Sequence, residues 1–187
     1  MKFSLISLLS LATLAMAQRE VAGYDSLSLG AFKASPFKGL NYSDNWSVGQ
    51  SKVQVSNVKW RSPKVLFSGP QEVGRLFGTM NREDINLRFD TESVYASCSG
   101  PKKNGKKTTV PCTVMVEGYK RNTAGIDASP VIIKYTDTTR MQKVDLGNLS
   151  NINKIKFTVT KAGKNDELTD GVTLVLDSFI YSLDEKE

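Results

Sequence analysis

The stretch Lys-Ile-Lys-Phe-Thr-Val-Thr at residues 154–160 places an apolar side chain at every second position. This period of two is typical of a β-strand with one face in the core and the other in water. The same alternation recurs at residues 85–89, 112–116 and 131–135. The longer stretch 171–183 is apolar on both faces and predicts a central strand covered from both sides. Its predicted faces are Val172, Leu174, Leu176 and Ile180 on one side, and Val175, Phe179 and Tyr181 on the other.

Turn-forming residues separate these runs. Gly, Pro, Asn and Asp gather at residues 68–70, 99–101, 122–130 and 163–170. Between Ser51 and Trp60 the alternation slips by one position, which predicts a bulge or turn at residues 56–57. Short strands with turn signals and no helical periodicity predict an all-β chain, folded as an antiparallel β-sandwich.

The first 17 residues have the pattern of a secretory signal peptide. Lys2 is followed by a largely apolar run at residues 3–14, and Ala15-Met16-Ala17 fits the small-x-small rule for cleavage before Gln18. The run is shorter than the roughly 20 apolar residues that a bilayer span needs. We expect a soluble, extracellular product with no membrane span, in which residues 18–187 form a single domain.

Secretion determines how the two cysteines are interpreted. In an oxidising compartment an even pair is normally bridged, so Cys98 and Cys112 are predicted to form a disulfide. The alternative is a reactive thiol, but neither cysteine has a histidine to activate it. Three Asn-x-Ser sequons, at Asn41, Asn45 and Asn148, become candidate glycosylation sites.

The chain of 187 residues contains no histidine. This excludes Ser-His-Asp and Cys-His nucleophiles, histidine-ligated zinc and imidazole acid–base catalysis. Glycoside hydrolysis by two carboxylates remains open, and Glu92 and Glu117, which flank the cysteine pair, are the pair to test. We expect no enzymatic activity, because two tryptophans make a poor aromatic cleft for such an enzyme.

Four short motifs carry a resemblance to a known group of proteins. They begin at Gly23, Pro36, Tyr95 and Leu174, and the third is paired with the segment at residues 111–119. With them the chain resembles secreted fungal jelly-roll proteins of unknown function, which are galactose-binding-like or carbohydrate-binding-module-like. The resemblance implies a jelly-roll type of β-sandwich.

In calcium-binding jelly rolls of this kind, acidic residues from the opening and closing strands help to hold a structural ion. The resemblance therefore makes Asp25 and Asp177 the candidate calcium ligands, together with backbone carbonyls and water. This chain has Ser26 and Ser178 where that pattern often has a second acidic residue. The alternative is that both aspartates are solvent-facing, and we expect no other cofactor.

Two further groups are candidate ligand-binding residues. Lys102, Lys103, Lys106 and Lys107 lie inside the predicted disulfide loop, where they could engage an anionic partner or simply form a solvated turn. Nucleic acid is not expected as a partner, because the chain lacks interleaved basic and aromatic residues. The aromatic residues that could stack on a sugar are Trp46, Trp60, Tyr42 and Tyr95. Trp46 lies in a polar segment and is expected to be exposed, whereas Trp60 is expected in the core.

Two functions follow from these patterns. The first is a secreted, non-enzymatic protein that binds a carbohydrate or another cell-surface ligand. The second is a secreted effector or elicitor that uses the basic loop to act on a host protein at a fungus–host boundary. Binding on a glycan array favours the first, and a host phenotype without glycan binding favours the second.

Overall fold

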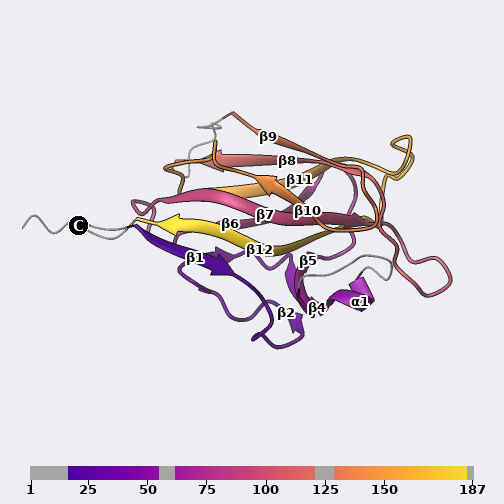
Figure 1. The fold of residues 1–187 in the computed structure, drawn as a ribbon, viewed down its shortest axis with the longest axis horizontal. Coiled ribbons are helices and arrows are strands. Elements are labelled where there is room, and N and C mark those ends of the chain that lie inside the picture. The colour runs from indigo at the N-terminus through magenta and orange to yellow at the C-terminus, as the bar shows by residue number, and fades with distance from the viewer. Residues whose placement is uncertain (1–16, 55–61, 121–128, 185–187) are drawn as a thin grey trace, which may run out of the picture.

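The computed structural model describes residues 17–54, 62–120 and 129–184. They form two antiparallel sheets packed together as a β-sandwich, whose longest strands run along the long axis of the molecule (Figure 1). The structure confirms the predicted fold class, an all-β sandwich of the jelly-roll type.

The first sheet has seven strands, in which β12 occupies a central place. The path across it is β10 (Gln142–Asp145), β7 (Phe89–Ser99), β12 (Thr173–Leu183), β5 (Lys64–Ser68), β4 (Trp46–Gln50) and β2 (Gly30–Ala31). The remaining strand, β1 (Gln18–Ala22), pairs antiparallel with the last five residues of β12. The opening and closing strands therefore lie side by side.

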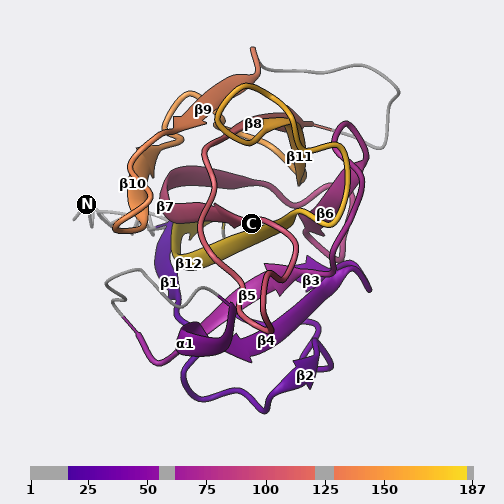
Figure 2. The ribbon, with the colours of Figure 1, turned by 90° about the vertical axis from the view of Figure 1, so that its right-hand side faces the viewer.

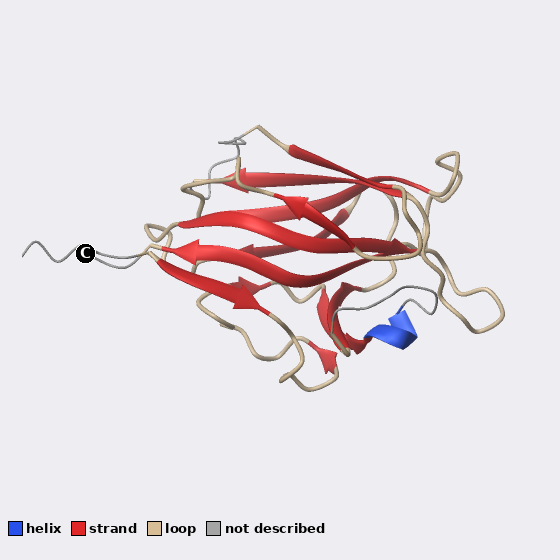
Figure 3. Ribbon diagram, in the orientation of Figure 1, coloured by secondary structure: helices blue, strands red, loops and turns tan. Residues whose placement is uncertain are grey.

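The second sheet has five strands. Its order is β3 (Asn41–Tyr42), β6 (Leu76–Asn81), β11 (Lys154–Ala162), β8 (Cys112–Tyr119) and β9 (Val131–Tyr135). One helical turn, α1 (Ser51–Gln54), follows β4 and stands at the margin of the sandwich (Figure 3).

The alternating stretch at residues 154–160 forms the middle of the second sheet, as predicted. Ile155, Phe157 and Val159 are fully buried in the main core. Strand β11 pairs with β6 on one side and β8 on the other. The alternating segments at 112–116 and 131–135 are likewise strands, β8 and β9, that pair with each other.

The closing strand is central, as predicted, but its two faces differ from the prediction. Ser178 adopts a left-handed backbone conformation with φ of 47°, and the register of β12 against β7 shifts between Asp177 and Ile180. This bulge reverses the phase of the strand. Phe179 and Tyr181 consequently join Leu176 in the main core, and Ile180 is left half-buried.

Two other segments correct the sequence prediction. Residues 85–88 are not a strand, because Asn86 N–H bonds to Asp84 Oδ1 at 2.9 Å and Leu87 N–H bonds to Asp84 O at 3.1 Å, which forms a turn. Ser51 to Gln54 is a helical turn rather than the start of an alternating strand. The predicted bulge at residues 56–57 and the predicted core position of Trp60 lie outside the described residues.

The predicted disulfide is confirmed. Cys98 in β7 and Cys112 in β8 are bridged, with 6.2 Å between their Cα atoms. Since β7 belongs to the first sheet and β8 to the second, the bond ties the two layers together through the core. Both cysteines are buried.

Candidate functional site

A groove of about 580 Å³ lies on the outer side of the first sheet, along β7 and β10. Its lining residues come from β7, from the loop between β9 and β10, and from the start of β10. They are Tyr95, Thr136, Asp137, Arg140, Met141, Gln142 and Lys143. An aromatic ring thus shares one hollow with a carboxylate, a guanidinium, an amide and an ammonium group.

Strand β7 presents Tyr95 to the groove because its side chains alternate. Val94, Ala96 and Cys98 point into the main core, so Tyr95 lies on the opposite face. There the ring packs against a second, small apolar cluster of Val65, Met141 and Val175. That contact holds one side of the half-buried ring and leaves the remainder accessible in the groove.

Two serines flank Tyr95 on the same face of β7. Ser93 and Ser97 are about 2% and 1% exposed, and within the described part of the chain their hydroxyl groups have no hydrogen-bond partner. A buried hydroxyl without a partner is costly in a folded protein. Both hydroxyl groups are shielded from solvent, and neither serine is among the residues that line the groove.

The loop at residues 136–141 is held in shape by Asp137. Its carboxylate accepts hydrogen bonds from Thr139 N at 2.9 Å, from Thr139 Oγ1 at 2.6 Å and from Arg140 Nε at 2.9 Å. The bonds from Thr139, followed by the charge of Arg140, lower the pKa of the Asp137 carboxyl. The Arg140 side chain is 75% exposed, so its terminal amino groups remain accessible to a ligand.

Tyr135, the last residue of β9, also holds the loop at residues 136–141 in place. Its hydroxyl donates to Arg140 O at 3.1 Å, and burial raises the pKa of Tyr135 to about 12. The phenol therefore stays protonated, and the hydrogen bond persists, throughout the neutral range. The groove is thus built on a buried residue of β9 and on the buried cluster under Tyr95.

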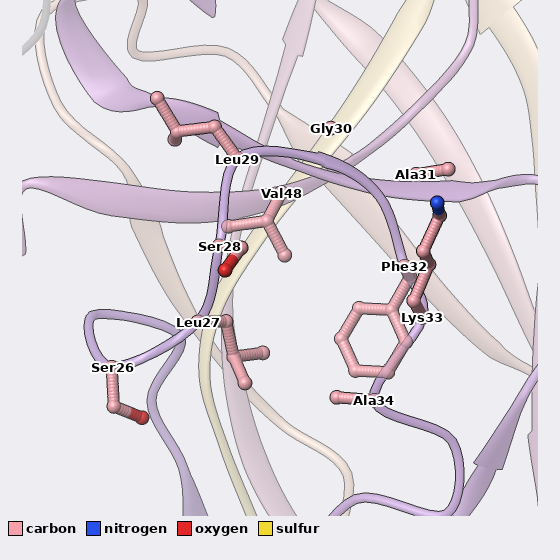
Figure 4. A pocket seen from close by; sticks show the side chains of 10 residues that line it. All are labelled: Ser26, Leu27, Ser28, Leu29, Gly30, Ala31, Phe32, Lys33, Ala34 and Val48. Atoms are coloured by element: carbon pink, nitrogen blue, oxygen red, sulfur yellow. The ribbon is translucent and has the colours of Figure 1, made fainter.

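A second hollow, of about 650 Å³, lies beside the loop at residues 26–34 (Figure 4). Leu27, Phe32 and Val48 line it, and all three are also part of the main core or pack against it. Apart from two serine hydroxyls and Lys33, its lining side chains are apolar. This hollow has few groups that could orient a ligand, so the groove at Tyr95 is the stronger candidate.

The expected exposure of Trp46 is wrong. The side chain is fully buried in β4, packs edge-on against Phe157 at 6.0 Å, and donates from Nε1 to Thr79 O at 3.1 Å. Gly78 in β6 makes room for it, since a Cβ at position 78 would come within 2.3 Å of the indole. Trp46 therefore fills the space between the sheets and cannot stack on a ligand. Tyr42 is buried as well.

The four lysines of the basic loop divide into two kinds. Lys102, Lys103 and Lys106 are exposed, whereas Lys107 is half-buried. Its ammonium group donates to Gln54 Oε1 at 3.2 Å and to Thr173 Oγ1 at 3.1 Å, and lies 5.7 Å from the centre of the Phe67 ring. Lys107 thus attaches the loop to the body of the sandwich.

Asp25 is hydrogen-bonded to the first residue of β5, and Asp177 to a residue just before that strand. Asp25 Oδ1 accepts from Lys64 N at 3.0 Å, and Asp177 Oδ2 accepts from Ser62 Oγ at 2.6 Å. Burial, and to a smaller extent the nearby Asp25 carboxylate, raise the pKa of Asp177, which is fully buried rather than solvent-facing. Among the described residues, no group of three or more Cys, Asp or Glu side chains is placed to hold a metal ion. The calcium site stays a prediction, and its signature would be a calcium-dependent melting temperature that Asp177→Asn abolishes.

The two carboxylates proposed for glycoside hydrolysis are not brought together. Glu92 lies in β7 of the first sheet and forms a bidentate pair with Arg19, at 2.8 and 3.0 Å. Glu117 lies in β8 of the second sheet, with its carboxylate 3.4 Å from Lys156 Nζ. The two carboxylates thus lie on strands of different sheets, and each is paired with a different cation, Arg19 or Lys156.

The sequons lie at the surface. Asn45 and Asn148 are exposed in loops, and Asn41 is half-buried in β3, where its Oδ1 accepts from Ser35 Oγ at 3.2 Å. Glycosylation of the three asparagines stays a prediction.

Comparisons with known proteins give distant likenesses in fold. No family model matches the chain, and no curated protein matches it. Among solved structures, the K2 cleaved adhesin domain of Lys-gingipain is similar, with a TM-score of 0.47 at 11% identity over 87% of this chain and 97% of that one. The K3 cleaved adhesin domain from Porphyromonas gingivalis w83 gives 0.41 at 11% identity, over 83% and 98%. The enzymatically active domain of tailspike protein 4 of bacteriophage CBA120 gives 0.40 at 9% identity, over 85% of this chain and 21% of that one.

Sequence reasoning missed most of the groove. It named Tyr95 among four aromatics, but it singled out none of Asp137, Arg140 and Lys143. The run Asp-Thr-Thr-Arg at residues 137–140 has the composition of a turn in which an aspartate bonds back to the chain. That signal predicts the turn, but not its position beside Tyr95, which depends on the pairing of β10 with β7.

Proposed function

We propose that residues 18–187 form a secreted, non-enzymatic binding domain that takes a carbohydrate in the groove at Tyr95. The observation that carries this proposal is the half-exposed aromatic ring flanked by groups that can bond to hydroxyls. A sugar ring presents apolar C–H faces to an aromatic side chain and hydroxyl groups around its rim. Sites of this kind combine an aromatic surface with a few polar groups that fix orientation.

The polar groups of the groove are suited to hydrogen bonding with the hydroxyl groups of a sugar ring. Arg140 and Lys143 supply donors, and the Gln142 amide supplies both donors and an acceptor. Asp137 is the one carboxylate among the lining residues, so the groove lacks the second carboxylate that glycoside hydrolysis uses. These features support binding rather than cleavage.

The disulfide supports an extracellular location for the protein, because such bonds persist in oxidising compartments. Among the described residues, no helix has the length and the apolar character needed to cross a bilayer. Both observations agree with export through the predicted signal peptide.

A glycan array with the oxidised mature domain tests the proposal. We expect binding to at least one glycan, and a loss of at least roughly tenfold in affinity in Tyr95→Ala, as for a central aromatic contact. Tyr119→Ala is the matched control, because Tyr119 is also half-buried but lies in β8 of the second sheet. Equal affinities of the two variants would contradict the assignment of the groove.

A further inference from the structure

The loop between β7 and β8 forms a hydrogen-bonded hairpin. Lys103 and Lys106 exchange backbone hydrogen bonds at 2.9 and 3.1 Å around a two-residue turn, Asn104-Gly105. Both turn residues have positive φ, 52° and 77°, as a tight hairpin turn requires. The disulfide and the bond from Val110 N to Cys98 O, at 3.0 Å, close its base. We call residues 102–107 the lysine hairpin.

The lysine hairpin crosses the end of the sandwich towards α1 (Figure 2). Its attachment through Lys107 to Gln54 and Thr173 fixes that direction. Three ammonium groups, those of Lys102, Lys103 and Lys106, are then presented to solvent from a rigid support. Because the loop is already ordered, less conformational entropy of the loop is lost when a partner binds.

Positive charge is crowded in this region. Burial, and next the charge of Lys102, lower the pKa of Lys107. Backbone hydrogen bonds within its own loop, from Asn165 N at 2.7 Å and Lys164 N at 3.1 Å among them, lower the pKa of the Glu167 carboxyl, and the charge of Lys103 lowers it to a smaller extent. An added anion would relieve the repulsion among the lysines.

The hairpin and the groove at Tyr95 are physically connected. Thr109, at the base of the hairpin, donates from Oγ1 to Thr138 O at 2.6 Å, in the loop that lines the groove. From Tyr95 to Ser99, where the hairpin leaves β7, the strand rises by about 13 Å at roughly 3.3 Å per residue. The groove itself contributes two further cations, Arg140 and Lys143. The base of the lysine hairpin is therefore bonded to the loop that lines the groove, while the hairpin itself runs towards α1.

We propose that the ligand of the groove is an acidic polysaccharide, one stretch of which stacks at Tyr95 while its anionic groups reach the lysine hairpin. This inference rests on the proposed function and adds the class of ligand to it. Carboxylate and sulfate groups are both suited to exposed lysines, so the shared chemistry is a repeated anionic group on a sugar chain. Steering by such charges weakens steeply with added salt.

Matched pairs of probes test the inference. Polygalacturonate is compared with its methyl ester, and dextran sulfate with dextran, so that the members of each pair share a sugar backbone and differ in their anionic groups. The wild type should bind at least one acidic probe more tightly than its neutral counterpart in low salt, and the difference should shrink as salt is added. Replacing Lys102, Lys103 and Lys106 by Gln should weaken acidic binding by roughly tenfold and leave neutral binding unchanged.

A control variant removes the same charge elsewhere. Lys33→Gln, Lys134→Gln and Lys154→Gln together change the net charge equally but lie outside the hairpin and the groove. If the hairpin and control variants weaken acidic binding equally, or if neither acidic probe binds, the inference is wrong. If hairpin substitution abolishes binding and Tyr95→Ala does not affect it, the groove assignment fails and the lysine hairpin alone is the site. If acidic and neutral probes bind equally and Tyr95→Ala abolishes both, the proposed function stands and the acidic class is wrong.

Discussion

Removing the disulfide should destabilise the fold without changing its architecture. Cys98 and Cys112 are 14 residues apart in sequence and join the two sheets, so the bond restricts the unfolded chain. For a loop of this length the chain-entropy term is about 3 kcal/mol. Alanine is the appropriate replacement, because both positions are buried and a serine hydroxyl would add a further cost. For a domain of this size, 3 kcal/mol lowers the melting temperature by roughly 6 to 12 °C.

Urea unfolding followed by tryptophan fluorescence measures this difference. The double variant Cys98→Ala/Cys112→Ala should unfold at a lower urea concentration than the oxidised wild type, and a reductant should lower the midpoint of the wild type alone. Far-ultraviolet circular dichroism should show that the folded variant retains its strand content. Coincident urea midpoints for the variant and the oxidised wild type would refute the reasoning, as would free-thiol labelling of both cysteines in native protein.

Three other predictions follow from buried positions. Trp46→Ala should cost about 3 to 5 kcal/mol in urea unfolding because it empties a core site, and a small loss would place the indole outside the core. Gly78→Ala should cost about 1 to 3 kcal/mol by overpacking against the same indole, whereas an unchanged midpoint would contradict that contact. Because burial raises the folded-state pKa of Asp177, its contribution to stability is fully present below the unfolded pKa, near 3.9, and is lost as pH rises through the higher folded value. Asp177→Asn should flatten the pH dependence of the melting temperature in that window, and an identical slope in the variant would exclude Asp177 as the source.

Local alternation was sufficient to predict much of the sheet structure. Strand β11 has one polar and one apolar face, so its pattern could be recognised without knowledge of its neighbours. In β12, by contrast, both faces are apolar, and the pattern could not show that a positive φ at Ser178 reverses the phase. A bulge of this kind depends on pairing with β7, which is distant in sequence.

The site was harder to predict than the fold for the same reason. Trp46 lies between polar residues, yet Gly78 and Phe157, from two other strands, provide the space and the contact that bury it. Tyr95 was recognisable as an aromatic residue, but its partner loop at residues 136–141 reaches it only through long-range strand pairing. The disulfide was predictable because it required only two cysteines and an oxidising compartment.

The central claim is that ligand binds in the groove at Tyr95, and an NMR titration of the isotope-labelled mature domain tests it most directly. On addition of an acidic polysaccharide fragment, amide shifts should concentrate at residues 93–97 and 136–143, with a second set at residues 102–107. Tyr95→Ala should remove the first set. Shifts that gather at residues 26–34, around the other hollow, with residues 93–97 and 136–143 unchanged, would contradict the account.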